Sequence, residues 1–153
     1  MTALSLALQL GTVDGGDLVE GVLATLLYFA VGGGVLVLGF VVLDALTPGD
    51  LRRQVYVERH GGAALLLAAN HLSLAVIVVT AILTSADALA QGLVDSAVYG
   101  LLGIALQAVA LRVLDAVVPG HLGALVSERA TGAAWAVAAT LVAVGAVNAA
   151  ALS

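Results

Sequence analysis

Four uncharged or nearly uncharged apolar runs alternate with short polar stretches along the chain. The runs cover residues 21–43, 61–86, 96–118 and 130–153, and only the third carries charges, Arg112 and Asp115, near its end. A helix needs about 20 apolar residues to span the hydrocarbon core of a bilayer. The pattern therefore predicts an all-α membrane protein with four transmembrane helices. The glycine-rich acidic segment 11–21 ahead of them is expected to be an exposed, flexible lead-in.

A nine-residue turn sequence occurs twice. Residues 43–51 read LDALTPGDL and residues 114–122 read LDAVVPGHL, with six of nine positions identical at an offset of 71. Repetition of this kind indicates internal duplication. We predict one membrane domain, 1–153, with an outer lead-in at 1–18 and two tandem helical-hairpin repeats at 19–89 and 90–153. Because each repeat has two spans, the repeats are expected to be parallel, with Pro48 and Pro119 ending the first and third helices.

Composition and charge refine this prediction. Apolar residues make up 62% of the chain, charged residues 10%, and the mean hydropathy is +1.16, which is typical of an integral membrane protein. All basic residues lie in or beside the connections between helices one and two and between helices three and four: Arg52, Arg53, Arg59, Arg112 and Arg129. The positive-inside rule then predicts cytoplasmic connections, and both termini outside the bacterial inner membrane.

The basic residues outside the third helix are expected to contact membrane lipids or a partner. Arg52 and Arg53 extend the basic surface, while Arg59 and Arg129 begin the second helix of each repeat, where arginine can reach lipid phosphate. Trp135 near the same interface is interpreted as an interfacial anchor.

Small residues are frequent in the predicted spans, where they allow helix backbones to approach closely. Gly32, Gly33, Gly34 and Gly39 lie in the first span, Gly100 and Gly103 in the third, and Ala134-xxx-Ala138 and Gly145-xxx-Ala149 in the fourth. They are expected to pack helices within one subunit, with some left for contacts in a homo-oligomer.

Charged residues near the ends of the spans are one candidate site. Asp44 and Asp115 are equivalent in the two repeats, and Arg112 precedes Asp115 by three positions on the same helix face. One hypothesis is that Arg112 bridges both acids and joins the two halves. The alternatives are a local Arg112–Asp115 pair with Asp44 hydrated at the interface, or a pair of carboxylates that relays a cation or proton.

Uncharged polar residues inside the spans are a second set of candidates. Asn70 and His71 lie about midway along the second helix, with Ser73 nearby, while Gln107 and Asn148 lie in the third and fourth. His71 could handle protons, because its reference pKa is near 6.5. The alternative for all of them is hydrogen bonding between helices, worth about 0.6 kcal/mol on average.

The duplicated turn, the segment RVLDAVVPG and Asn148 carry a resemblance that covers nearly the whole chain from Leu18. On these residues the chain resembles domain-of-unknown-function family number 350, the YjfL-like small bacterial inner-membrane proteins. The resemblance implies a four-span membrane protein without an established biochemical activity.

Signals of other functions are absent from the sequence. It has no Gly-rich phosphate loop, no cysteine, and no His pair at metal-binding spacing among His60, His71 and His121, so neither an enzyme nor a metal or other cofactor is expected. Five basic residues argue against nucleic-acid binding. We predict a self-associating structural or interaction component of the bacterial envelope, with membrane lipids, copies of itself and an envelope protein as partners. The alternative is a small oligomeric channel lined by Asp44 and Asp115, with a transporter a more remote reading.

Overall fold

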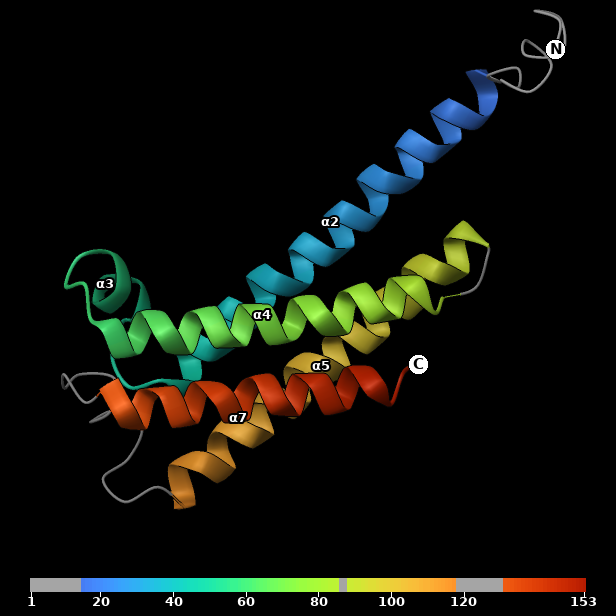
Figure 1. The fold of residues 1–153 in the computed structure, drawn as a ribbon. Helices are drawn as coiled ribbons and strands as arrows, with labels where there is room; N and C mark the ends of the chain where they lie inside the picture. Colours follow the sequence, from blue (N-terminus) through green and yellow to red (C-terminus); the bar gives the residue numbers. More distant parts are fainter. Residues whose placement is uncertain (1–14, 86–87, 118–130) are drawn as a thin grey trace, which may run out of the picture.

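The fold is known from a computed structural model, which describes residues 15–85, 88–117 and 131–153. All regular structure in these ranges is helical, which confirms the predicted all-α class. The helices are α2 (Gly15–Leu46), α3 (Leu51–Tyr56), α4 (Gly61–Leu83), α5 (Leu89–Val117) and α7 (Thr131–Ala150) (Figure 1). Four of them, all except α3, are long and apolar enough to cross a membrane, as predicted.

Two of the long helices begin earlier than predicted. Residues 15–20 were expected in a flexible lead-in, but they form the first turns of α2, where Asp17 lies near the positive end of the helix dipole. Similarly, α5 begins at Leu89 and not at residue 96. The polar residues there are exposed, so a helix can include them without burying a charge. At its other end α2 stops at Leu46, just before Pro48, as predicted.

The polar stretch after α2 contains a short helix that hydropathy did not predict. Asp50 is the N-cap of α3, and its side chain accepts a hydrogen bond of 2.9 Å from the backbone N–H of Arg53. Gly49 has a φ of +93°, a left-handed conformation that glycine adopts without steric cost. The side chain of Gln54 donates to the carbonyl of Pro48 at 3.1 Å. The Pro-Gly sequence therefore forms a closed turn, and its predicted equivalent at Pro119 lies outside the described residues.

The long helices run in two directions. Figure 1 shows α2 and α5 running one way and α4 and α7 the other, with α3 and the starts of α4 and α7 at one end of the bundle. We call this end, which carries Leu46, α3, Gly61 and Thr131, the α3 end. The helix directions agree with the parallel arrangement expected of two hairpins, while the duplication itself stays a prediction.

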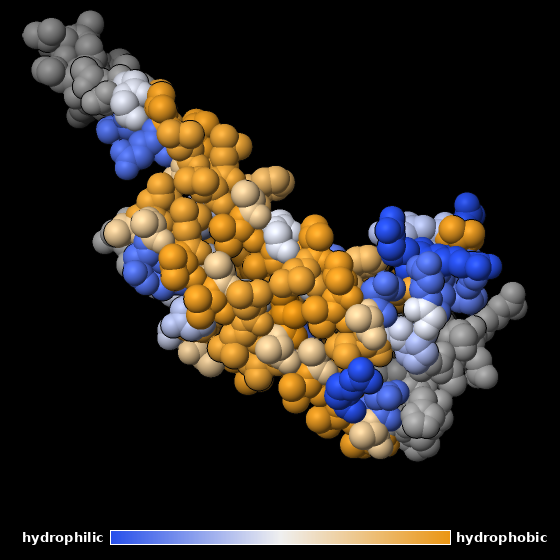
Figure 2. All heavy atoms as spheres, turned by 180° about the vertical axis from the view of Figure 1, so that it is seen from behind, coloured by the Kyte–Doolittle hydropathy of each residue, from blue (hydrophilic) through white to orange (hydrophobic). Residues whose placement is uncertain are grey.

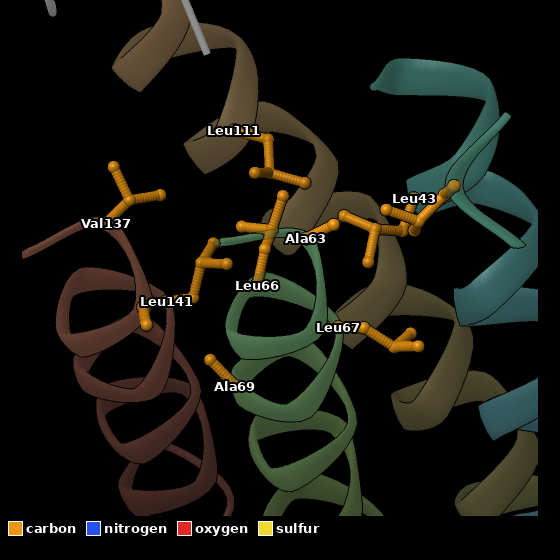
Figure 3. Close-up of a cluster of buried hydrophobic side chains, with 10 residues drawn as sticks. Leu43, Ala63, Leu66, Leu67, Ala69, Leu111, Val137 and Leu141 are labelled. Carbon is orange, nitrogen blue, oxygen red and sulfur yellow. The ribbon is translucent and has the colours of Figure 1, made fainter. Parts of the chain in front are cut away.

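Helices α4 and α5 each pack against the other three long helices, and α4 is the more deeply buried of the two. Half of its most apolar stretch is buried, compared with 17% for α2. One hydrophobic cluster near the α3 end joins all four long helices, with Leu43 from α2, Leu66 from α4, Leu111 from α5 and Leu141 from α7 (Figure 3). A second cluster around Ile77 joins the same four helices farther from the α3 end.

Glycines allow the close helix contacts. A Cβ atom on Gly39 would overlap Leu74, and one on Gly100 would lie 2.7 Å from Val35. Gly145 in α7 comes close to the backbone of α4, because a Cβ on Gly145 would lie 3.0 Å from the Cα atom of Ser73.

Two of the glycines expected in packing contacts do not make them. A Cβ on Gly33 or on Gly34 would meet nothing within 4 Å, because these residues point away from the other helices. Three successive glycines cannot all face one neighbour on a helix, which leaves this pair for the homo-oligomer contacts that were also expected of some small residues.

Substitution of Gly145 tests whether backbone approach holds α4 against α7. Gly145→Ala is expected to lower the free energy of unfolding by about 1–3 kcal/mol, because its Cβ would meet the Ser73 backbone. Gly33→Ala is the matched control and should be neutral or gain up to about 1 kcal/mol from helix propensity. Equilibrium unfolding in mixed micelles measures both. Equal effects of the two variants would contradict this packing.

Candidate functional site

Three helices meet at one buried polar contact, which we call the Ser73 junction. It consists of Ser73 in α4, Gln107 in α5 and the backbone carbonyl of Leu141 in α7. The Ser73 hydroxyl donates to this carbonyl at 2.9 Å, and the Gln107 side-chain amide donates to it at 3.1 Å. The Gln107 amide also contacts the Ser73 hydroxyl. Both side chains are nearly inaccessible, with exposures of 1% and 2%. One carbonyl thus ties three helices together.

The junction forms where α7 has room for it. Leu141 is one turn before Gly145, and the missing side chain of Gly145 lets Ser73 reach the α7 backbone. A helical carbonyl has one lone pair beyond its own helix bond, and the two donors share it. Leaving a polar group without a hydrogen bond is costly in lipid, so the Ser73 hydroxyl needs an acceptor such as this carbonyl.

Three amide atoms near the junction lack hydrogen-bond partners. They are Nδ2 of Asn70, Oε1 of Gln107 and Nδ2 of Asn148, and all three are buried. Asn70 and Gln107 line one narrow space between α2, α4 and α5, which has no room for a water-sized sphere. The unpaired amide of Asn148 lies beside Gly103, one turn from Gln107 on α5. These groups are uncharged, so they can hold helices but offer no ordinary acid or base.

His71 lies apart from the junction. Its Nδ1 atom is 3.0 Å from the carbonyl of Leu67 in its own helix, and its ring packs against Phe40 of α2, with 6.3 Å between ring centroids. The ring is half-buried at the α2–α4 contact. Among the residues that the structure describes, no group of three or more His, Asp or Glu side chains could hold a metal ion.

The bridge expected between Arg112 and the two acids is not formed. Asp44 is half-buried, and its carboxylate accepts a hydrogen bond of 2.8 Å from the backbone N–H of Leu51, at the start of α3. Arg112 is exposed, and no ion pair within the described ranges joins it to Asp44 or Asp115. Asp115 is half-buried and engaged in another interaction. The short turn after α2 brings an unpaired backbone donor to Asp44, which explains why the carboxylate points there.

The arginines of the α3 end differ in their partners. Arg53 pairs with Glu58 at 2.8 Å, and Glu58 also lies 3.7 Å from Nδ1 of His60. Arg52 and Arg59 are exposed, and Arg59 has a φ of 56°, rare for a residue with a side chain. Arg129 lies outside the described residues.

Sequence reasoning singled out Asn70, Gln107 and Asn148 but gave no role to Ser73, although it forms the junction. The spacing held a signal, because Asn70 and Ser73 are three positions apart and therefore lie on one face of α4. No sequence pattern could identify the Leu141 carbonyl, because every residue has a backbone carbonyl whatever its type.

Comparison with known proteins places the chain among membrane proteins. The family model described as Domain of Unknown Function (DUF350) matches residues 17–152. A UPF0719 transmembrane protein of Mycolicibacterium paratuberculosis (strain ATCC BAA-968 / K-10) is 45% identical over 149 residues, covering 97% of this chain and 99% of the relative. A UPF0719 transmembrane protein of Mycobacterium bovis (strain ATCC BAA-935 / AF2122/97) is 46% identical over 144 residues, covering 94% and 95%. No solved structure matches the chain.

A double-mutant cycle tests the Ser73 junction. Ser73→Ala and Gln107→Met each remove a donor to the Leu141 carbonyl, and each is expected to lower the free energy of unfolding by about 0.6 kcal/mol, at most about 1.7. Because they share one acceptor, the double variant should lose less than the sum of the two. Thr140→Val is the control, since the exposed Thr140 bonds only within α7. Additive losses measured by unfolding in bicelles would show that the two donors act independently.

The role of Asp44 is tested by comparing two substitutions. Asp44→Ala removes the acceptor for the Leu51 N–H and should speed hydrogen exchange of that amide about fivefold, since losing such a cap costs about 1 kcal/mol. Asp44→Asn keeps a side-chain oxygen and should preserve most of the protection. Amide exchange read by NMR in micelles checks both. If the Leu51 amide exchanged as fast in Asp44→Asn as in Asp44→Ala, the negative charge and not the hydrogen bond would be what matters.

Proposed function

We propose that this chain, which belongs to the DUF350 family, is a structural component of the membrane that associates with copies of itself. The family match confirms the resemblance predicted from the duplicated turn. The chain is a multi-pass membrane protein, as its four apolar helices and its transmembrane relatives indicate. Figure 2 shows the corresponding surface, an apolar band between polar groups at the two ends of the molecule.

The observation that carries the proposal is the outer face of α2. Only the second half of this helix has buried residues, and its first half projects away from the other helices (Figure 1). One exposed stripe runs along the helix at spacings of three and four: Leu23, Leu26, Ala30, Gly34, Val37 and Val41. The bundle leaves this face entirely free.

The centre of the stripe has the composition of a helix-packing site. Ala30 and Gly34 are four positions apart and lie between larger aliphatic residues, which is the small-xxx-small pattern that lets two membrane helices approach. A Cβ on Gly34 would meet nothing within 4 Å, so no part of the chain that the structure describes uses this gap. We infer that a second copy packs here through its own α2.

A structural role also suits the buried polar residues. The Ser73 junction consists of uncharged groups that bond to one another, an arrangement that fixes helices and performs no proton transfer. Asp44, one of the two acids of the channel alternative, uses a carboxylate oxygen to cap α3. We therefore favour the structural role over a channel, and we propose no enzymatic activity.

The proposed orientation follows from the arginines. We propose that the α3 end, with Arg52, Arg53 and Arg59, faces the cytoplasm in the bacterial inner membrane. Both termini then lie outside, where an envelope protein is the proposed partner.

Substitution on the α2 stripe tests self-association. Gly34→Leu is expected to raise the dissociation constant of the oligomer at least tenfold, because it fills the gap through which the two backbones approach. Ala105→Leu, at an exposed position of α5, is the matched control and should leave association unchanged. Photobleaching steps counted in liposomes give the number of subunits. A monomeric wild-type chain, or equal association of the two variants, would refute the proposal.

A further inference from the structure

A second apolar feature of the surface lies on helices α4 and α7, apart from the outer stripe of α2. Helices α4 and α7 leave an open groove of about 470 Å³ between them, which we call the α4–α7 groove. Its walls are aliphatic side chains and one aromatic ring, namely Leu65, Ala68 and Leu72 from α4 and Trp135, Ala139 and Ala146 from α7. The small alanines keep it hollow, and neither wall offers a polar side chain.

The groove matches the depth of one membrane leaflet. From Trp135 to Ala146 it follows eleven residues of α7, or about 16 Å at 1.5 Å per residue. Half of a hydrocarbon core of about 30 Å is about 15 Å. A helix that crosses the bilayer would need a groove along the whole bundle, whereas on α4 this groove takes in only Leu65 to Leu72 of Gly61–Leu83. Its length therefore favours an acyl chain over a second protein helix.

Positive charge is available where the groove begins. The described acids beside α3 are each engaged: Asp44 by the Leu51 N–H, Asp50 by the Arg53 N–H and Glu58 by the Arg53 side chain. Arg52 and Arg59 are exposed and make no ion pair with any residue in the described ranges. Both guanidinium groups are therefore available to contact a phosphate.

Arg59 is the arginine best placed for the groove. It lies two residues before α4, and Leu65, the first groove residue of that helix, follows one turn after the helix start. The N-cap residue His60 makes no side-chain capping bond, and the first turn of α4 has no acid, so the positive end of the helix dipole adds to the charge of Arg59. Along the chain into α4, a positively charged region therefore comes first and an apolar groove follows. A phospholipid has the same order, with a charged headgroup followed by an apolar acyl chain.

We propose that the α4–α7 groove binds one acyl chain of an anionic phospholipid whose headgroup phosphate contacts Arg59. Trp135, which is 64% exposed, lines the groove near the start of α7, and tryptophan is favoured at a lipid interface. The site goes beyond self-association, because it uses helices α4 and α7 and not the outer stripe of α2.

Trp135 is the single tryptophan of the chain, so its fluorescence reports on this groove alone. The full-length protein is placed in phosphatidylcholine vesicles that contain a minor fraction of lipid with brominated acyl chains, as either phosphatidylglycerol or phosphatidylcholine. Bromine quenches tryptophan on contact. Brominated phosphatidylglycerol should bind next to Trp135 about fivefold more strongly than brominated phosphatidylcholine, the preference expected of one basic residue at an anionic headgroup.

Two pairs of variants assign the preference to the site. Arg59→Gln should abolish it, while Arg52→Gln, on exposed α3, should keep it. Ala143→Phe fills the groove and should reduce quenching by both lipids, while Ala136→Phe, exposed on α7 outside the groove, should not. Circular dichroism verifies that each variant keeps its helices.

Three results would overturn the proposal. Equal quenching by the two lipids would show that the headgroup is not recognised. Equal loss of the lipid preference in the two arginine variants would attribute the preference to general surface charge. A change in subunit number for Ala143→Phe, without a change in quenching, would show that a second copy occupies the groove.

Discussion

The structure depends on the hydrogen bonds that Ser73 and Gln107 donate to one backbone carbonyl of α7. In a bilayer the lipid chains are as apolar as leucine, so burying aliphatic side chains does little to bring helices together. Close backbone approach and polar contacts must do it. The bundle uses both at one place, because the absence of a side chain on Gly145 lets Ser73 reach the Leu141 carbonyl. Helix α4, which also packs on α2, thereby positions every other long helix.

This inner organisation determines which surfaces remain for function. In the part of the bundle that the structure describes, Ser73 and Gln107 bond to the α7 backbone and Asp44 accepts from the Leu51 N–H, so these groups are used within the chain. The outer surface offers two features for partners. The α2 stripe around Gly34 and the α4–α7 groove lie on different helices, and each has a shape that suits one kind of partner, a second helix or a lipid chain. The stripe and the groove both exist because small residues lie where no described neighbour fills the space beside them.

Hydropathy predicted the fold class and the four helices, since a run of about 20 uncharged residues has few alternatives in a membrane. It misplaced the start of α2, because Asp17 and Glu20 look like a loop but are tolerated in an exposed helix turn. It also missed α3, whose formation depends on the cap by Asp50 and not on hydropathy. Asn70, Gln107 and Asn148 were found from polarity alone. Charge and spacing suggested an Arg112 bridge as one hypothesis, but they say nothing of the backbone N–H of Leu51, which donates to the Asp44 carboxylate. Which of the glycines pack could not be read from sequence, since Gly32 and Gly34 differ only in the direction they face.

Solid-state NMR on the full-length protein in bilayers tests the central contact most directly. With ¹⁵N in glutamine side chains and ¹³C at leucine carbonyls, the contact of 3.1 Å between Gln107 Nε2 and the Leu141 carbonyl should give a dipolar cross-peak. The peak should disappear in Gln107→Met. A spectrum in which the Gln107 side chain correlates with water or lipid, and with no leucine carbonyl, would contradict a bundle held together at Ser73.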